Sequence, residues 1–171
     1  MKGFVQVYTG NGKGKTTAAL GLALRAAGAG KKVFIAQFLK GSPSSELKSI
    51  ARLAPEIILE QYGRKKIILS APDSRDIARA RQGLEKVKNA ITSRKYDLLI
   101  LDEINLAVHL KLISIEDLLA IMDIKPDNLE LVLTGRYAHP RLLARADLVT
   151  EMKEIKHYYT RGVSARKGIE K

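Results

Sequence analysis

The chain has 171 residues, of which 46% are hydrophobic and 28% are charged, and this size and composition suit one domain with a buried core over residues 1–171. It contains no cysteine, which excludes disulfides, thiolate metal sites and cysteine nucleophiles. No apolar run reaches the roughly 20 residues of a membrane span. The N-terminus also lacks the apolar core of a signal peptide. We therefore expect a cytoplasmic protein without a membrane partner.

Thirty lysines and arginines against eighteen acidic residues give a formal net charge of +12, which favours anionic partners such as phosphates, nucleotides or nucleic acid. More than half of this excess lies in residues 61–95, which hold ten basic and three acidic side chains. This segment is either a solvated basic helix face or a surface for nucleic acid. An aromatic content of 5% and the absence of a recognition motif argue against nucleic acid.

Short apolar runs alternate with helical patterns along the chain. The runs predict strands over residues 4–8, 33–38, 57–61, 98–101, 129–134 and 148–152. Helices are predicted over 16–29, 45–53, 114–122 and 140–146, and a longer one begins at Asp73. The helix over 16–29 is apolar almost all round and rich in small residues, so we expect it to be largely buried against a sheet.

The longer helix shows the clearest amphipathic pattern. Its apolar residues recur at intervals of three and four, at Ile77, Ala80, Leu84, Val87 and Ile91. Asp73 or Ser74 can cap its first turn. The regular alternation of strands and helices predicts an α/β fold with a mainly parallel sheet and helices on both faces.

The strongest motif lies directly between the first predicted strand and the first predicted helix. It reads Thr9-Gly10-Asn11-Gly12-Lys13-Gly14-Lys15-Thr16-Thr17. Glycines let backbone N–H groups surround an oxyanion, and the following helix N-terminus favours the same charge. Lys15 can reach bound phosphates, and the Thr16 hydroxyl can ligate Mg²⁺.

The motif departs from G-x-x-x-x-G-K-[ST] at one position, because Thr9 stands where the first glycine is expected. The alternative is a glycine-rich connector with two solvated lysines. The strand before it and the helix after it favour a phosphate-binding P-loop, and with it a RecA-like version of the α/β fold.

Acidic and basic residues follow two further strands. Asp102 and Glu103 come directly after the run 98–101, and Arg136 follows the strand over 129–134. The carboxyl ends of parallel strands meet at one edge of a sheet, where ligands bind. We expect Asp102 and Glu103 to join Thr16 in a Mg²⁺ site and Glu103 to be able to act as a base. Arg136 either neutralises phosphate charge or is an ordinary surface arginine.

Two other groups of residues are less informative. His109, His139 and His157 show no metal-ligand spacing. Tyr158 and Tyr159 lie beside several basic residues, so they either stack on a planar ligand or pack the C-terminal tail against the domain.

The sequence resembles the P-loop ATP:corrinoid adenosyltransferases of cobalamin synthesis and salvage. The matching segments are 9–17, 37–41, 97–105, 133–136, 146–152 and the tail over 156–170. The resemblance implies transfer of the 5′-deoxyadenosyl group of ATP to the Co(I) of a reduced corrinoid, with release of tripolyphosphate. It also implies that the nucleotide lies reversed relative to other P-loop proteins.

The resemblance implies roles for individual residues as well. ATP would be held by Thr9, Gly10, Asn11, Gly12, Lys13, Gly14, Lys15, Thr16 and Thr17. Lys15, Glu103 and Arg136 would act in catalysis, while Thr16, Asp102 and Glu103 would hold Mg²⁺. A homodimer and a flavoprotein electron donor are implied in the same way, and nucleic acid is not.

One stretch departs from the family. Members typically carry a Gly-Phe-Thr-Trp-like segment before the long helix, whereas this chain has Tyr62-Gly63-Arg64-Lys65-Lys66-Ile67-Ile68 and no tryptophan. Tyr62, Ile67 and Ile68 are the residues here that compare with the usual aromatic pair as apolar cover for the corrinoid. The three cations of this stretch would favour a corrinoid with free carboxylates. The alternative function is a P-loop ATPase or phosphotransferase, which would release ADP or phosphate rather than tripolyphosphate.

Overall fold

The computed structural model describes residues 2–64 and 72–170, so the predictions for Lys65, Lys66, Ile67 and Ile68 lie outside the described residues. Within them the chain forms one six-stranded sheet in the order β3-β2-β4-β5-β1-β6. The strands are β1 (Val5–Thr9), β2 (Val33–Phe38), β3 (Ile57–Tyr62), β4 (Leu98–Asp102), β5 (Glu130–Thr134) and β6 (Leu148–Glu151). Every pairing is parallel, which confirms the predicted fold class.

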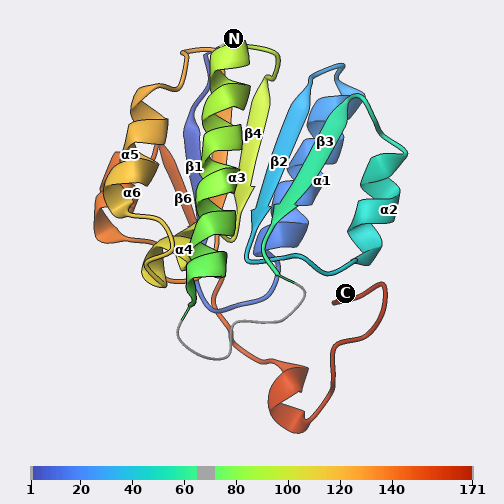
Figure 1. Ribbon diagram of the computed structural model, residues 1–171. Helices are drawn as coiled ribbons and strands as arrows, with labels where there is room; N and C mark the ends of the chain where they lie inside the picture. Colours follow the sequence, from blue (N-terminus) through green and yellow to red (C-terminus); the bar gives the residue numbers. More distant parts are fainter. Residues whose placement is uncertain (1, 65–71, 171) are drawn as a thin grey trace.

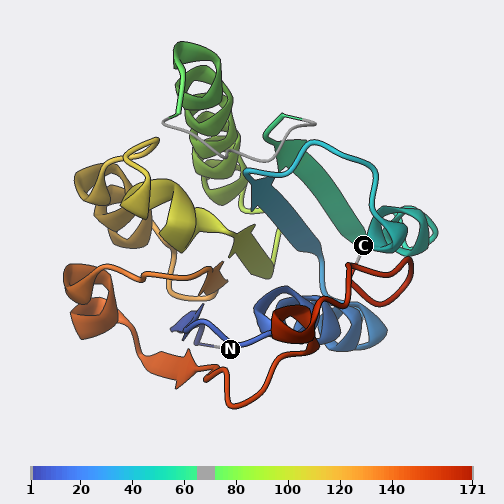
Figure 2. The ribbon, with the colours of Figure 1, turned by 90° about the horizontal axis from the view of Figure 1, so that it is seen from below.

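Helices cover both faces of this sheet. They are α1 (Lys15–Gly28), α2 (Ser45–Ala51), α3 (Ser74–Ser93), α4 (Ile104–His109), α5 (Ile115–Asp123), α6 (Pro140–Arg145) and the 3₁₀ helix η1 (Tyr158–Arg161). One apolar core joins the sheet to α1 and α2, and the other joins it to α3, α4, α5 and α6. Figure 1 shows α3 in front of the sheet and α1 behind it, and Figure 2 shows the same two layers from below.

The sequence explains the two cores. Successive strand residues point to opposite faces, so Val33 and Ile35 of β2 pack with the core of α1 while Phe34 and Phe38 pack with that of α3. The predicted cap of α3 is confirmed, since the Asp73 carboxylate accepts hydrogen bonds from two backbone amides of the first turn. The strands and the core are therefore those that the apolar pattern indicates.

The expectation that the first helix is largely buried is wrong. Only Lys15, Ala19 and Ala23 of α1 are buried, and Leu24 is 58% exposed. The helix contacts the sheet along one narrow face, and the residues on its other face are exposed to solvent. Of the described residues, none belongs to a helix with the length and hydropathy to cross a membrane.

The C-terminal tail, which we define as residues 152–170, leaves β6 and passes below the edge where the strands end (Figure 1). Seen from below, it lies beside the N-terminal end of α1 (Figure 2). This path brings the last described residues of the chain next to the glycine-rich loop after β1.

Candidate active site

The loop between β1 and α1 packs closely against the start of the C-terminal tail. A Cβ atom on Gly10 would lie 2.4 Å from the Met152 carbonyl oxygen, and one on Gly12 would lie 2.7 Å from it. The Gly12 amide donates a hydrogen bond of 2.7 Å to the same carbonyl. Gly10 also has a φ of 93°, a conformation that favours glycine. Glycine is therefore required here for two reasons, the close backbone contact and the left-handed turn.

Lys15 is held inside the curve of this loop. Its Nζ donates hydrogen bonds of 2.7 Å to the carbonyl oxygens of Gly10 and Gly12, and the residue is 7% exposed. Burial lowers the pKa of its ammonium group. Both acceptors are neutral, and an anionic phosphate oxygen is a stronger acceptor for an ammonium group. Lys15 is thus positioned to exchange its carbonyl partners for phosphate.

Asp102 lies at the end of β4 and is 1% exposed. Its Oδ1 accepts hydrogen bonds from the hydroxyls of Thr16 at 2.9 Å and Thr134 at 2.7 Å. Its Oδ2 accepts from Lys40 Nζ at 3.0 Å and Gln37 Nε2 at 3.2 Å. A buried carboxylate is tolerated where such partners satisfy it. This network fixes the start of α1 to the centre of the sheet.

Sheet register brings these side chains together. Gln37 of β2 lies opposite both Asp102 of β4 and Gln61 of β3, and Gln61 Nε2 donates to Gln37 Oε1 at 3.0 Å. Thr134 lies opposite Tyr8 of β1 and so stands beside the glycine-rich loop. A polar row therefore crosses the ends of the parallel strands, where ligands bind in such folds.

Glu103 follows Asp102 with a left-handed φ of 61° and is the N-cap residue of α4. Its backbone amide donates to the Thr134 hydroxyl at 3.0 Å. Burial raises the pKa of its carboxyl group, and the charge of Asp102 raises it further. Opposing cations that lower this pKa are Lys40, Lys15 and Arg136. The site thus places a second carboxyl group among three positive charges.

Asn105 holds the turn that carries Arg136. The Asn105 Nδ2 donates to the Gly135 carbonyl at 3.2 Å, and Asn105 itself is 1% exposed. The turn follows β5 directly, so Arg136 reaches the same edge of the sheet as Glu103. Asn105 is a positioning residue to which the sequence pattern assigned no role.

The glycine-rich loop, Glu103 and Arg136 line one cavity of about 570 Å³. The loop and the first turn of α1 form one wall, α2 contributes another, and the end of the C-terminal tail contributes a third. The cations that line it are Lys13, Lys15, Lys40 and Arg136. Four positive side chains around a glycine-rich loop at a helix N-terminus suit a polyphosphate.

The family model of the ATP:corrinoid adenosyltransferases BtuR/CobO/CobP matches residues 1–170. The chain belongs to this family. It is 34% identical to the corrinoid adenosyltransferase of Pseudomonas aeruginosa over 99% of this chain and 84% of that protein. It is 33% identical to the corrinoid adenosyltransferase of Escherichia coli K12 and 32% identical to corrinoid adenosyltransferase CobA of Salmonella typhimurium, each over 99% of this chain and 86% of the relative.

The structure of this adenosyltransferase family member brings together most of the predicted site residues. Gly12, Lys13, Gly14, Lys15, Thr16 and Thr17 line the cavity together with Glu103 and Arg136, while Asp102 bonds to Thr16 beneath it. Thr9, Gly10 and Asn11 do not line the cavity. Thr9 ends β1, and its carbonyl accepts a hydrogen bond from the Met152 amide. The first part of the motif therefore shapes the loop, and the second part faces the cavity.

The expected role of Tyr62 in covering a corrinoid is wrong. Tyr62 is 5% exposed, and its ring packs beneath α3, where a Cβ on Gly83 would lie 2.7 Å from it. The Tyr62 hydroxyl also bonds to Glu60. Arg64 forms a two-pronged ion pair with Asp76 at 2.6 and 2.7 Å, so its charge is already paired. Tyr62 therefore belongs to the core beneath α3, and Arg64 is held at the start of the same helix.

A second cavity of about 690 Å³ lies at the same edge of the sheet, between α3, α4 and the β5–α6 connection. Tyr137, the residue after Arg136, lines it and stacks on His109 with ring centroids 4.4 Å apart. Tyr137 is 53% exposed and has a left-handed φ of 58°, an unusual conformation for an aromatic residue. Arg81, Lys111 and His139 also line this cavity.

Proposed function

We propose that this chain transfers the 5′-deoxyadenosyl group of ATP to the Co(I) of a reduced corrinoid and releases tripolyphosphate. In this reaction Co(I) supplies the electron pair of the new Co–C5′ bond. The C5′–O bond breaks, and its electrons leave with the triphosphate. The observation that carries the proposal is the cationic cavity around the phosphate loop in a chain of this family.

The protein needs no nucleophile of its own, so its residues act by position and charge. Lys15 and Lys13 lie at the loop, and Lys40 and Arg136 line the same cavity. Fixed cations stabilise the negative charge that grows on the leaving triphosphate, and they do so without reorganising during the reaction. Holding C5′ and the cobalt in line for the reaction also lowers its barrier.

Mg²⁺ is part of the proposal, and the residues present suit it. The Thr16 hydroxyl lies 2.9 Å from Asp102 Oδ1, so two hard oxygen donors meet at the cavity floor, with Glu103 beside them. Mg²⁺ usually takes one or two such ligands together with water and substrate phosphates. When bound, it would neutralise charge on the triphosphate. The described residues form no group of three or more histidine or acidic side chains that could hold a metal ion. The proposed site does not need one, because substrate phosphates and water would supply the other ligands of Mg²⁺.

We further propose that the corrinoid docks at the second cavity, with the His109–Tyr137 pair against its plane. The exposed stacked rings offer a flat apolar surface, and Arg81, Lys111 and His139 can meet peripheral carboxylates or amides. Arg136 lines the nucleotide cavity, and the next residue, Tyr137, lines the second cavity. The two cavities are thus neighbours across one short connection, as a transfer between two substrates requires.

Homodimer formation, a flavoprotein electron donor and a cytoplasmic location complete the proposal. The edge strand β6 supports the first of these, because Leu148 and Val149 are 45% and 46% exposed there. Light scattering in solution tests the dimer. Reduced flavoproteins can be tested by replacing the chemical reductant in the assay described next.

Anaerobic incubation with MgATP and chemically reduced cobalamin tests the central proposal. We expect the light-sensitive spectrum of an adenosylated corrinoid to appear together with one equivalent of tripolyphosphate. Formation of ADP or phosphate without a Co–C bond would instead support the phosphotransferase alternative.

A further inference from the structure

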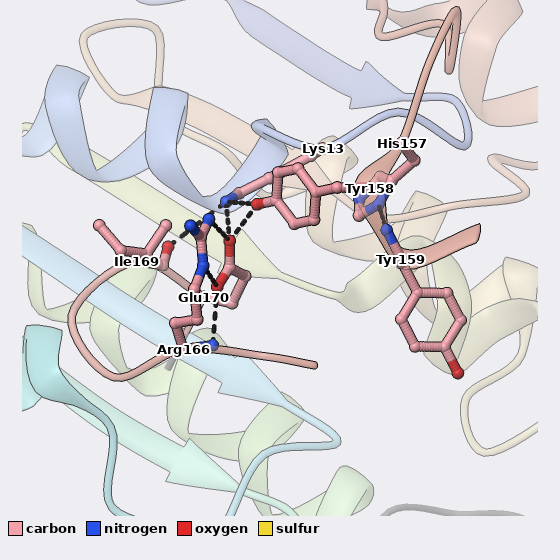
Figure 3. A network of polar contacts seen from close by, with 7 residues as sticks. All are labelled: Lys13, His157, Tyr158, Tyr159, Arg166, Ile169 and Glu170. Carbon is pink, nitrogen blue, oxygen red and sulfur yellow. Dashed lines mark hydrogen bonds and ion pairs between the residues drawn. The ribbon is translucent and has the colours of Figure 1, made fainter. Parts of the chain in front are cut away.

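The end of the C-terminal tail is tied to the phosphate loop by one carboxylate (Figure 3). Glu170 Oε1 lies 2.9 Å from Lys13 Nζ and 3.0 Å from Arg166 Nη2. Glu170 Oε2 accepts a 2.7 Å hydrogen bond from the Arg166 backbone amide, and the Tyr158 hydroxyl also bonds to this carboxylate. The Lys13–Glu170 contact joins residues that are 157 positions apart in the sequence.

Lys13 contacts three groups of this tail. Its ammonium group donates to Glu170, to the Tyr158 hydroxyl at 2.8 Å and to the Ile169 carbonyl at 3.5 Å. An ammonium group has three protons, and the two short contacts, with Glu170 and Tyr158, engage two of them. A phosphate oxygen therefore competes with Glu170 for Lys13.

Glu170 also brings a negative charge to a cavity that four cations line together with Glu46 and Glu103. It lines the cavity together with Gly168 and Ile169. Hydrogen bonds from Arg166 and Lys13 hold the pKa of its carboxyl group well below the usual range, so it stays ionised at neutral pH. This charge repels a polyphosphate at the position where the loop would receive it.

We propose that the C-terminal tail is a latch on the nucleotide cavity, in which the Glu170 carboxylate holds Lys13 until an incoming polyphosphate displaces it. The proposal rests on the polyphosphate site of the proposed function and adds to it a competition between Glu170 and substrate. A polyphosphate carries several negative charges against one on Glu170, so it can take Lys13 over. Loss of this contact frees the tail, which opens the cavity wall.

Inorganic tripolyphosphate and the Glu170→Gln variant test the latch. The glutamine keeps the size of the side chain and removes its charge. We expect the variant to bind tripolyphosphate about two- to fivefold more tightly than the wild type in calorimetry, the range of a partly exposed ion pair. Glu154→Gln is the matched control, because Glu154 lies in the same tail and does not line the nucleotide cavity. Its affinity should equal that of the wild type.

Limited trypsin digestion gives a second readout, since Arg161 and Lys167 are exposed in the tail. Tripolyphosphate should speed cleavage of the wild-type tail, and the Glu170→Gln tail should be cut rapidly without ligand. Equal or weaker tripolyphosphate binding by Glu170→Gln, or protection of the wild-type tail by tripolyphosphate, overturns the latch and makes the tail a clamp. Failure of both proteins to bind tripolyphosphate would instead overturn the proposed nucleotide site.

Discussion

The two sides of the nucleotide cavity are built in different ways. On the sheet side, Asp102 is 1% exposed and its four donors come from α1, two strand ends and the segment after β2. On the tail side, the Lys13 side chain is 39% exposed and its partner Glu170 comes from the end of the chain. One side follows from strand register, and the other depends on charges at the surface.

This difference separates a fixed wall from an exchangeable one. A buried carboxylate that loses a partner leaves an unsatisfied charge, so the whole network is difficult to change. Exposed ion pairs are screened by salt and contribute little to stability, so they can be replaced by a ligand. The fixed wall is suited to positioning substrate, and the exchangeable one is suited to admitting it.

The largest effect should come from Lys15→Ala, which removes the cation at the centre of the loop. We expect the rate of adenosyl transfer to fall by about 100-fold or more, because a fixed charge at the leaving triphosphate is lost. MgATP affinity should fall in calorimetry, with a melting temperature within about 3 °C of the wild type. Lys31→Ala is the control, since Lys31 lies at the other end of α1, beyond its last residue. Unchanged MgATP affinity in folded Lys15→Ala would contradict the role of the loop.

Asp102→Asn should break the fixed wall. Its amide group would direct N–H protons toward donors such as Gln37 and Lys40, so we expect a loss of about 2–4 kcal/mol of unfolding free energy. The Mg²⁺ concentration needed for activity should also rise. The matched control is Asp123→Asn, because Asp123 pairs with Arg145 at the surface with its side chain 58% exposed. Equal stability of the two variants in urea would contradict the buried network.

Much of the fold was predictable because it follows apolar periodicity. All six strands were predicted. The bounds of β2 are those expected, and each of the other five strands differs from its expected bounds by one residue at one or both ends. Helix α4 was missed, because it follows β4 after Glu103 alone and no turn residue separates them. Glu103 makes this sharp turn with a left-handed φ, which its residue type does not predict.

The site was predictable where a local motif carries it and not where distant segments meet. Residues 12–17, Glu103 and Arg136 were assigned from their positions after strands, and the structure places them around one cavity. Gln37 and Lys40 had no assigned role, although their position at the end of a strand was a usable signal. The contact of Glu170 with Lys13 joins segments without periodicity, so nothing local indicates it.

A smaller effect should distinguish the second cavity from the nucleotide cavity. Tyr137→Ala removes the ring stacked on His109, and we expect corrinoid binding to weaken about fivefold, as the loss of one aromatic contact implies. Affinity for MgATP should not change. Tyr159→Ala is the control, because this tail tyrosine is 73% exposed and does not line the second cavity. Equal corrinoid affinity of the two variants in an absorbance titration would move the corrinoid elsewhere.

The smallest effect should be a pH-dependent stability difference at Glu103. Burial raises its pKa above the ordinary value of 4.5, so the folded protein binds a proton more tightly there than the unfolded chain does. Wild-type stability is therefore lost as the pH rises from about 4.5 through the folded pKa. Glu103→Gln removes this cost. We expect the variant to melt at a higher temperature than the wild type at pH 7, with the difference vanishing below about pH 4.5.

Glu116→Gln provides a control of opposite sign. The Arg141 guanidinium lowers the pKa of Glu116, so this carboxylate stabilises the fold above pH 4.5 and its contribution is lost as the pH falls. Glu116→Gln should accordingly melt slightly below the wild type at pH 7 and match it in acid. Melting temperatures of the three proteins between about pH 4 and pH 8 compare the two shifts directly. If Glu103→Gln instead follows Glu116→Gln in sign, Glu103 is stabilised as an anion by the surrounding cations, and the fixed wall already carries a balanced charge before substrate binds.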